Sequence, residues 1–238
     1  MKSILCYITV VLLFNLNSTA QNNYLGTWNV ANIQYSFNKK TSIWAEGQLR
    51  SQKFVNDFFY HEIKTGINYK PNKSIGIIVG IGQYNTYSIG GNFKTPITAH
   101  EFRLWEQFTL VNNIGNLKLE HRYRIEQRWR NSEYRNRFRY RINPILPINK
   151  NKLQNKTLFA TLYDEIFLSD KPGYFERNRF FAGFGYQFSK SITLQSGFIR
   201  QFDYSPSQSS TKDFFQTTLF IRLQHQNETT DLHPSSID

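Results

Sequence analysis

Charged side chains recur at every second position along residues 117–130, and the pattern resumes at 135–142 after a short break. The intervening positions carry mostly apolar side chains, among them Tyr123, Ile125 and Trp129. Successive side chains of a strand point to opposite faces, so this spacing predicts a hairpin with one apolar and one charged face. Guanidinium groups on such a face can bind carboxylates in bidentate geometry. The first chemistry that the sequence suggests is therefore ion pairing.

The turns around this hairpin give a register for the charged side chains. It places Glu126 between Arg103 and Arg139, and Glu101 beside Arg128. A similar register across the next hairpin brings Glu165 near Arg137. Cross-strand neighbours at this spacing can form charge pairs. The predicted charge network consists of Glu101, Arg103, Arg122, Arg124, Glu126, Arg128, Arg137, Arg139, Arg141 and Glu165.

Two interpretations of this charged face remain open. In the first, the charges pair with one another and fill a narrow barrel, because small barrels are usually filled by their own side chains. In the second, a positive surplus attracts anionic solutes, since nine basic and only three acidic residues lie between Lys118 and Arg141. The second interpretation expects Arg122, Arg124, Arg139 and Arg141 to line an anion-binding or anion-passing region.

Enzymatic chemistry has weaker support. Some outer-membrane barrels are lipid-modifying hydrolases, and His100 lies near a long loop, with Ser88 and Ser205 at loop ends. No nucleophile motif accompanies them, and a triad is recognised by geometry rather than by isolated residues. We therefore predict no catalytic residue, no metal site and no cofactor. A lipid-modifying hydrolase stays open as an alternative.

Eleven probable strands follow one another along the chain. Single-chain bacterial barrels normally have an even number of strands. Either one strand is missed or merged, for example within residues 24–37, or the first segment pairs unusually, and we expect ten or twelve strands. Tight turns on one side and longer loops on the other are typical of outer-membrane barrels. The segments are 24–37, 42–54, 58–70, 75–87, 98–111, 117–130, 135–146, 156–168, 179–188, 192–203 and 213–223.

The two ends of the chain differ from its centre. Residues 1–20 have a basic start, an apolar run and a small-residue site before Gln21, which predicts a secretory signal peptide. Residues 21–223 are the predicted barrel, and residues 224–238 a polar, flexible tail. Cys6, within the signal, is the one cysteine, so disulfides and thiolate ligands are excluded from the mature chain. Export predicts the outer membrane of a Gram-negative bacterium.

Composition agrees with an exported barrel. The formal net charge is +12, but export argues against nucleic acid and favours lipopolysaccharide and other outer-membrane lipid, anionic solutes or internal pairing. The aromatic fraction is 16%, and Phe, Tyr and Trp favour strands and membrane interfaces. The fold class predicted is all-β: a closed antiparallel transmembrane barrel with short periplasmic turns and longer outer loops. A soluble periplasmic barrel that binds a small ligand is the other alternative.

These features resemble a known family. The signal peptide is followed by Gly26-Thr27-Trp28 and an alternating strand, and the centre carries two Arg-rich segments that begin at His121 and Tyr134. Together they are similar to the domain-of-unknown-function family 2490 (DUF2490), exported barrel-like proteins common in Bacteroidetes. The similarity covers roughly residues 26–223. The resemblance implies an outer-membrane barrel and supplies no activity or functional residues.

Overall fold

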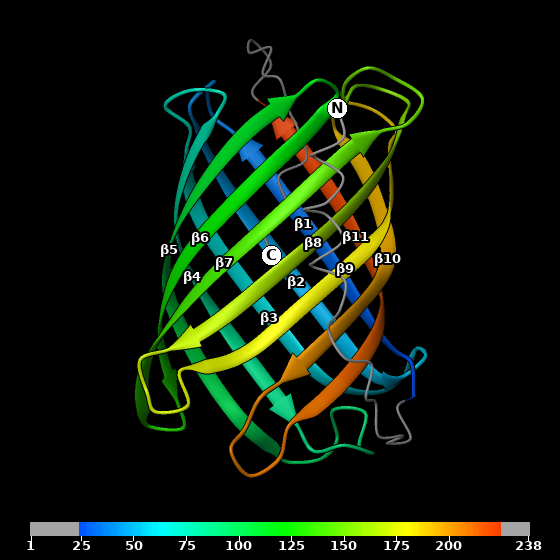
Figure 1. Ribbon diagram of the computed structural model, residues 1–238. Helices are drawn as coiled ribbons and strands as arrows, with labels where there is room; N and C mark the ends of the chain where they lie inside the picture. Colours follow the sequence, from blue (N-terminus) through cyan, green and yellow to red (C-terminus); the bar gives the residue numbers. More distant parts are fainter. Residues whose placement is uncertain (1–23, 225–238) are drawn as a thin grey trace, which may run out of the picture.

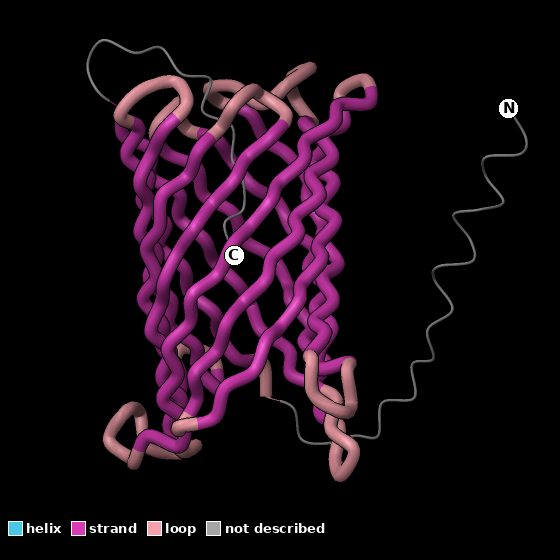
Figure 2. The backbone as a smooth tube through the Cα atoms, turned by 90° about the vertical axis from the view of Figure 1, so that its left-hand side faces the viewer, coloured by secondary structure: helices cyan, strands magenta, loops and turns pink. Residues whose placement is uncertain are grey.

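The computed structural model describes residues 24–224, which fold into a barrel of eleven tilted strands (Figures 1 and 2). The predicted signal peptide lies outside the described residues, as does the predicted tail except for Gln224, which ends the last strand. All eleven predicted segments are strands. They are β1 (Gly26–Ser36), β2 (Thr41–Lys53), β3 (Asn56–Tyr69), β4 (Ile75–Tyr87), β5 (Ile97–Ile114), β6 (Leu117–Arg130), β7 (Glu133–Pro147), β8 (Thr157–Ser169), β9 (Phe175–Gln187), β10 (Ile192–Asp203) and β11 (Ser210–Gln224).

The barrel closes through a parallel pair. Consecutive strands pair antiparallel, and β1 then pairs with β11 in parallel, from Gly26 opposite Phe214 to Ser36 opposite Gln224. The prediction of ten or twelve strands, all antiparallel, was wrong. With an odd number of alternating strands the first and last run in the same direction, so they can close the ring only as a parallel pair. No strand was missed within residues 24–37, which contain β1 alone. The other explanation of the odd count, an unusual pairing of the first segment, is confirmed by the parallel pair.

The odd count places the two ends of the described chain at opposite ends of the barrel. We call the end where β1 begins the lower end and the end where β11 finishes the upper end, as oriented in Figure 1. The predicted division into short turns and long loops is not found. Each end has one nine-residue connection, 88–96 at the lower end and 148–156 at the upper end. Several segments expected to be loops continue the strand pairing, which shortens the remaining connections.

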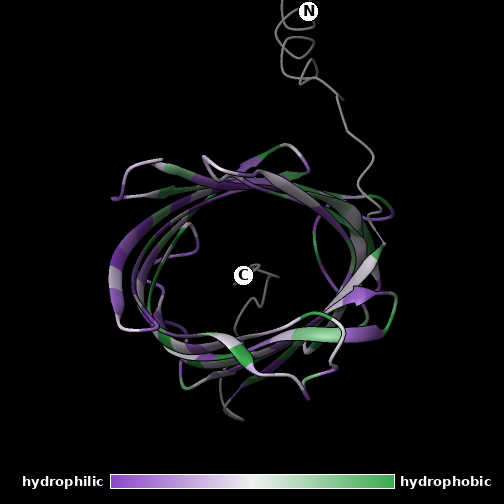
Figure 3. Cartoon of the chain, turned by 90° about the horizontal axis from the view of Figure 1, so that it is seen from below, coloured by the Kyte–Doolittle hydropathy of each residue, from purple (hydrophilic) through white to green (hydrophobic). Residues whose placement is uncertain are grey.

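The two faces of the wall have the expected orientation. The Arg124 and Arg139 side chains point inward and are 2% and 5% exposed, whereas Phe102 and Tyr123 point outward and are 43% and 46% exposed. Figure 3 looks along the barrel axis from the lower end and shows one closed wall. The same alternation continues around the ring. Other exposed apolar side chains of the strands include Ile33, Leu49, Ile63, Ile67, Ile77, Ile81, Phe108, Ile125, Phe138, Leu146, Leu162, Phe184, Leu194 and Phe198.

Aromatic side chains fill the middle of the lumen. Trp28 of β1 belongs to a buried cluster with residues of five other strands, including Phe59 of β3 and Phe181 of β9. Trp44 and Trp105 form a second cluster, with ring centroids 5.4 Å apart. Gly80 makes room for this pair, because a Cβ there would lie 2.5 Å from the Trp105 ring. The side chains of these clusters therefore pack the central part of the lumen.

Near the upper end, the long connection also contributes to the interior. Leu153 of the 148–156 connection is buried against Ile145 and Phe159. Part of the 148–156 connection therefore lies inside the barrel.

Candidate functional site: an arginine-rich vestibule

Glu126 of β6 is the centre of the charged interior. Its carboxylate has no exposed surface and accepts hydrogen bonds from Arg137 Nε at 2.8 Å and Arg139 Nη1 at 2.7 Å. Arg103 Nη1 and Arg124 Nη1 lie 3.8 and 3.7 Å from the same carboxylate. Glu126 thus lies between Arg103 and Arg139, as the hairpin register predicts, and it joins side chains of β5, β6 and β7.

Glu101 gives the second expected contact. Arg103 Nε donates to Glu101 Oε1 at 2.8 Å, and the Arg128 guanidinium bonds both oxygens of the same carboxylate. The β5–β6 register, with Arg103 opposite Arg128, produces this arrangement. Its two-residue turn, 115–116, leaves little freedom for any other pairing.

The predicted contact between Glu165 and Arg137 was wrong. In the β7–β8 ladder Glu165 lies opposite Arg141, and Arg137 lies four positions away, opposite Ser169. Glu165 instead accepts hydrogen bonds from Arg122 Nη2 at 2.5 Å and Arg139 Nε at 2.8 Å. The nine-residue connection between these strands does not fix the register as a tight turn would, so local spacing gave the wrong partner.

All ten residues of the predicted charge network point inward and are buried. They separate into two groups. Glu101, Arg103, Arg128, Arg137 and Arg139 border a cavity at the lower end, whereas the other five do not border it. Of the four arginines expected to line an anion site, only Arg139 lies at the cavity.

The other three arginines are held by neighbours in the packed interior. The Arg124 guanidinium lies over the Trp105 ring at 4.1 Å and donates to Gln107 at 2.9 Å. Arg122 bonds Glu165, and Arg141 lies over the Tyr163 ring at 4.9 Å. This group therefore braces the wall.

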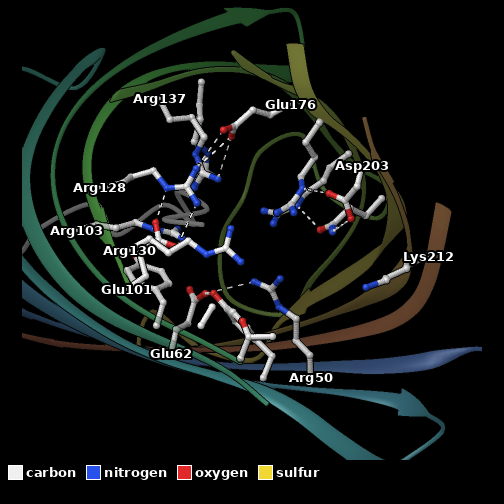
Figure 4. A pocket seen from close by; sticks show the side chains of 18 of the residues that line it. Arg50, Glu62, Glu101, Arg103, Arg128, Arg130, Arg137, Glu176, Asp203 and Lys212 are labelled. Carbon is white, nitrogen blue, oxygen red and sulfur yellow. Dashed lines mark hydrogen bonds and ion pairs between the residues drawn. The ribbon is translucent and has the colours of Figure 1, made fainter. Parts of the chain in front are cut away.

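The cavity, which we call the vestibule, has a volume of about 390 Å³ and opens at the lower end. Ten basic and four acidic side chains line it, together with aromatic rings (Figure 4). The basic side chains are Arg50, Arg103, Arg128, Arg130, Arg135, Arg137, Arg139, Arg177, Arg179 and Lys212, and the acidic ones are Glu62, Glu101, Glu176 and Asp203.

The half of this lining that comes from β2, β3, β9, β10 and β11 was not predicted from the sequence. The predicted network spans only residues 101–165, where the alternation is strongest. A weaker signal was present, since Arg177 and Arg179 share a strand face with the buried Phe181. Only closure of the ring brings that face opposite the Arg-rich hairpin.

Most vestibule cations have an acidic neighbour. Arg50 Nη2 lies 3.3 Å from Glu62 Oε2, and Arg177 is paired with Asp203. Among the described residues, Arg130 and Lys212 form no ion pair, and in Figure 4 the Arg130 side chain points into the vestibule toward Arg50. Because water is partly excluded, such surplus charge attracts anions more strongly than an open surface would.

A smaller cationic group lies at the upper end. Lys70, in the connection after β3, lies close to Lys118 and Arg222, with Glu120 as the acidic neighbour. Burial, together with the charges of Lys118 and Arg222, lowers the pKa of Lys70 to about 8, and the charge of Glu120 offsets only part of this effect.

This lowered pKa predicts a pH dependence of stability. Between about pH 8 and the ordinary pKa of lysine, the unfolded chain keeps a proton that folded Lys70 has released, so the free energy of unfolding rises with pH. Below about pH 8 the folded protein must bury the charged form and this gain is absent. Replacing Lys70 by Met should flatten the rise. Urea unfolding at about pH 7 and about pH 10 measures the free energy of unfolding of both proteins. An equal rise with pH in K70M and in the wild type would contradict its attribution to Lys70.

The three histidines among residues 24–224 lie apart from the vestibule, on the outer face. His100 Nδ1 is 2.7 Å from Asn85 Oδ1, His121 Nδ1 is 2.9 Å from the Tyr140 hydroxyl, and His61 Nε2 is 3.2 Å from the Tyr87 hydroxyl. Within residues 24–224, no three His, Cys, Asp or Glu side chains are grouped to hold a metal ion. The same residues form no helix whose length and hydropathy would suit it to crossing a bilayer.

The fold and the vestibule together define a closed, eleven-stranded β-barrel with a side-chain-filled interior and a basic vestibule at its lower end. The chain belongs to the family described as protein of unknown function (DUF2490), whose profile matches residues 25–212. This confirms the family suggested by the Arg-rich hairpin. No curated protein matches the chain.

Proposed function

We propose that this protein is an outer-membrane β-barrel that binds anionic solutes in its vestibule and does not pass them across the membrane. The proposed location is the outer membrane of a Gram-negative bacterium, after removal of the predicted signal peptide, with lipopolysaccharide and other outer-membrane lipid around the wall. Support for membrane insertion comes from the outward apolar side chains, which surround the ring at mid-height.

Aromatic side chains at both ends of the wall agree with this location. At the lower end the Trp129 and Tyr134 rings lie 5.3 Å apart. Near the upper end, Tyr186 packs on Phe188 with ring centroids 4.8 Å apart, and Tyr35 and Phe37 form a similar pair. Membrane barrels carry such aromatic girdles where the acyl chains meet the headgroups.

The vestibule lining is the observation that carries the binding function. Ten basic against four acidic side chains leave a positive surplus in a cavity of about 390 Å³. The size is in the range of small-molecule sites. Binding is favoured over passage because Trp28, Trp105 and Phe181 are fully buried in the packed middle of the lumen.

Equilibrium binding to the full chain in detergent micelles tests this function. We expect saturable binding of pyrophosphate and citrate at low ionic strength, measured by titration calorimetry. The double variant Arg130→Gln, Lys212→Gln should weaken it at least tenfold, because two cations without ion pairs are removed from the lining. Lys171→Gln, on the exposed 170–174 connection at the same end, is the control and should bind as the wild type does.

The same experiment distinguishes the alternatives. Absence of saturable binding, or equal binding by the double variant and the wild type, would refute the binding function. Planar-bilayer recordings should show no steady conductance. A steady anion-selective current would instead favour a pore, the passage interpretation of the charged lumen.

A further inference from the structure

Glu176 reaches the vestibule because of a β-bulge. In the β8–β9 ladder Phe167 pairs with Arg177 and Leu168 pairs with Phe175, so Glu176 is the extra residue between them. Simple alternation would point Glu176 outward, since Arg177 and Arg179 border the lumen. The bulge turns it inward, where its side chain is 18% exposed. Bulges of this kind re-aim a side chain and are common beside functional sites.

Three guanidinium groups surround the Glu176 carboxylate. Arg128 Nη1 lies 3.4 and 3.2 Å from its two oxygens, Arg135 Nη1 lies 3.0 Å from Oε1, and Arg137 Nη1 lies 3.6 Å from Oε2. Arg128 and Arg137 come from the facing ends of β6 and β7, and both point toward Glu176 in Figure 4. We call Arg128, Arg135 and Arg137 the clamp.

The clamp offers more charge and more donors than one carboxylate needs. Glu176 supplies one negative charge and two oxygens to three guanidinium groups. Arg128 also bonds Glu101 and Arg137 also bonds Glu126, but Arg135 has Glu176 as its one ion-pair partner among the described residues. A phosphoryl group carries nearly two negative charges and three acceptor oxygens, which matches three guanidinium groups more closely.

We propose that the clamp is a phosphoryl-binding site and that Glu176 occupies it until a phosphorylated solute displaces the carboxylate. This inference rests on the proposed function and names its ligand class, a small polar molecule that carries a phosphate monoester. Displacement requires rotation of one side chain, because the Glu176 backbone stays bonded through its carbonyl oxygen to Tyr204 N. The rest of the vestibule, whose lining includes Tyr60 and Tyr84, holds the part of the solute that does not belong to the phosphoryl group.

Removing the competing carboxylate tests the inference. In the full chain in detergent micelles, Glu176→Gln should raise the affinity for inorganic phosphate about tenfold, because the neutral amide competes less well for the guanidinium groups and does not repel the anion. Arg135→Gln should lower that affinity, since it removes the clamp member that pairs with Glu176 alone. Glu133→Gln is the matched control. It removes the same charge from an exposed position at the same end, outside the vestibule lining, and should leave the affinity unchanged.

The outcomes separate the inference from the function on which it rests. Equal affinities for phosphate in Glu176→Gln and Glu133→Gln would overturn the clamp as the site, while citrate binding that depends on Arg130 and Lys212 would leave the vestibule function standing. Absence of any saturable anion binding would overturn both. If Glu176→Gln does not fold, Glu176→Asp serves instead, because its shorter carboxylate holds the clamp less well and should raise phosphate affinity to a smaller extent.

Discussion

Glu126→Gln is expected to lower the free energy of unfolding by about 3 kcal/mol, the largest loss among single substitutions of the charged interior. Glu126 is fully buried and lies within 4 Å of guanidinium groups of Arg103, Arg124, Arg137 and Arg139. An amide of the same size keeps the packing but removes the charge that compensates them. Buried cations without a counter-charge are costly because water cannot solvate them.

Urea unfolding of the refolded protein in lipid vesicles measures this loss, with the gel shift of unheated samples as a second readout. Glu133→Gln, the same change at an exposed position, should fall within about 0.5 kcal/mol of the wild type. The double variant Glu126→Gln, Arg137→Gln should lose less than the sum of its single variants, because the two side chains interact directly. A midpoint for Glu126→Gln equal to that of Glu133→Gln would contradict the central role of this carboxylate.

Ile63→Arg is expected to destabilise the barrel in lipid by about 2–4 kcal/mol, the usual penalty for arginine on the lipid face near mid-membrane. Ile63 lies near the middle of β3, and its side chain is 68% exposed. If lipid surrounds the wall, the new guanidinium enters hydrocarbon. If water surrounds it, an exposed isoleucine can become arginine with almost no effect.

Ile89→Arg is the matched control, because Ile89 is 65% exposed but belongs to the 88–96 connection at the lower end. In lipid vesicles, unfolding should show a large loss for Ile63→Arg and almost none for Ile89→Arg. Equal, small effects in both variants would favour the soluble barrel over the membrane-embedded one.

Strand positions and faces were predictable because alternation is local. Tyr123 and Arg124 are neighbours in the chain, yet one lies outside and the other inside, as the period of two requires. Contacts across tight turns were predictable for a related reason. The two-residue turn at 115–116 fixes the β5–β6 register, so the Glu101–Arg128 pair could be inferred.

Contacts across longer connections could not be predicted, because such connections do not fix the register of the strands that they join. The partner of Glu165 was wrong because nine residues separate β7 from β8 and permit several registers. The inward direction of Glu176 was also not predictable, since a single bulge reverses the alternation and leaves no clear signal in composition.

The sequence by itself determined a β-barrel chain of this family, with the positions of its strand segments, an apolar outer face and an arginine-rich inner face, because each of these follows from residues close together in the chain. Only the tertiary structure decided the parallel closure of β1 on β11, the aromatic packing of the lumen and the vestibule that joins β2 and β3 to β9 and β11. Those features depend on which strands meet when the ring closes, and that is set by the packing of the whole interior at once.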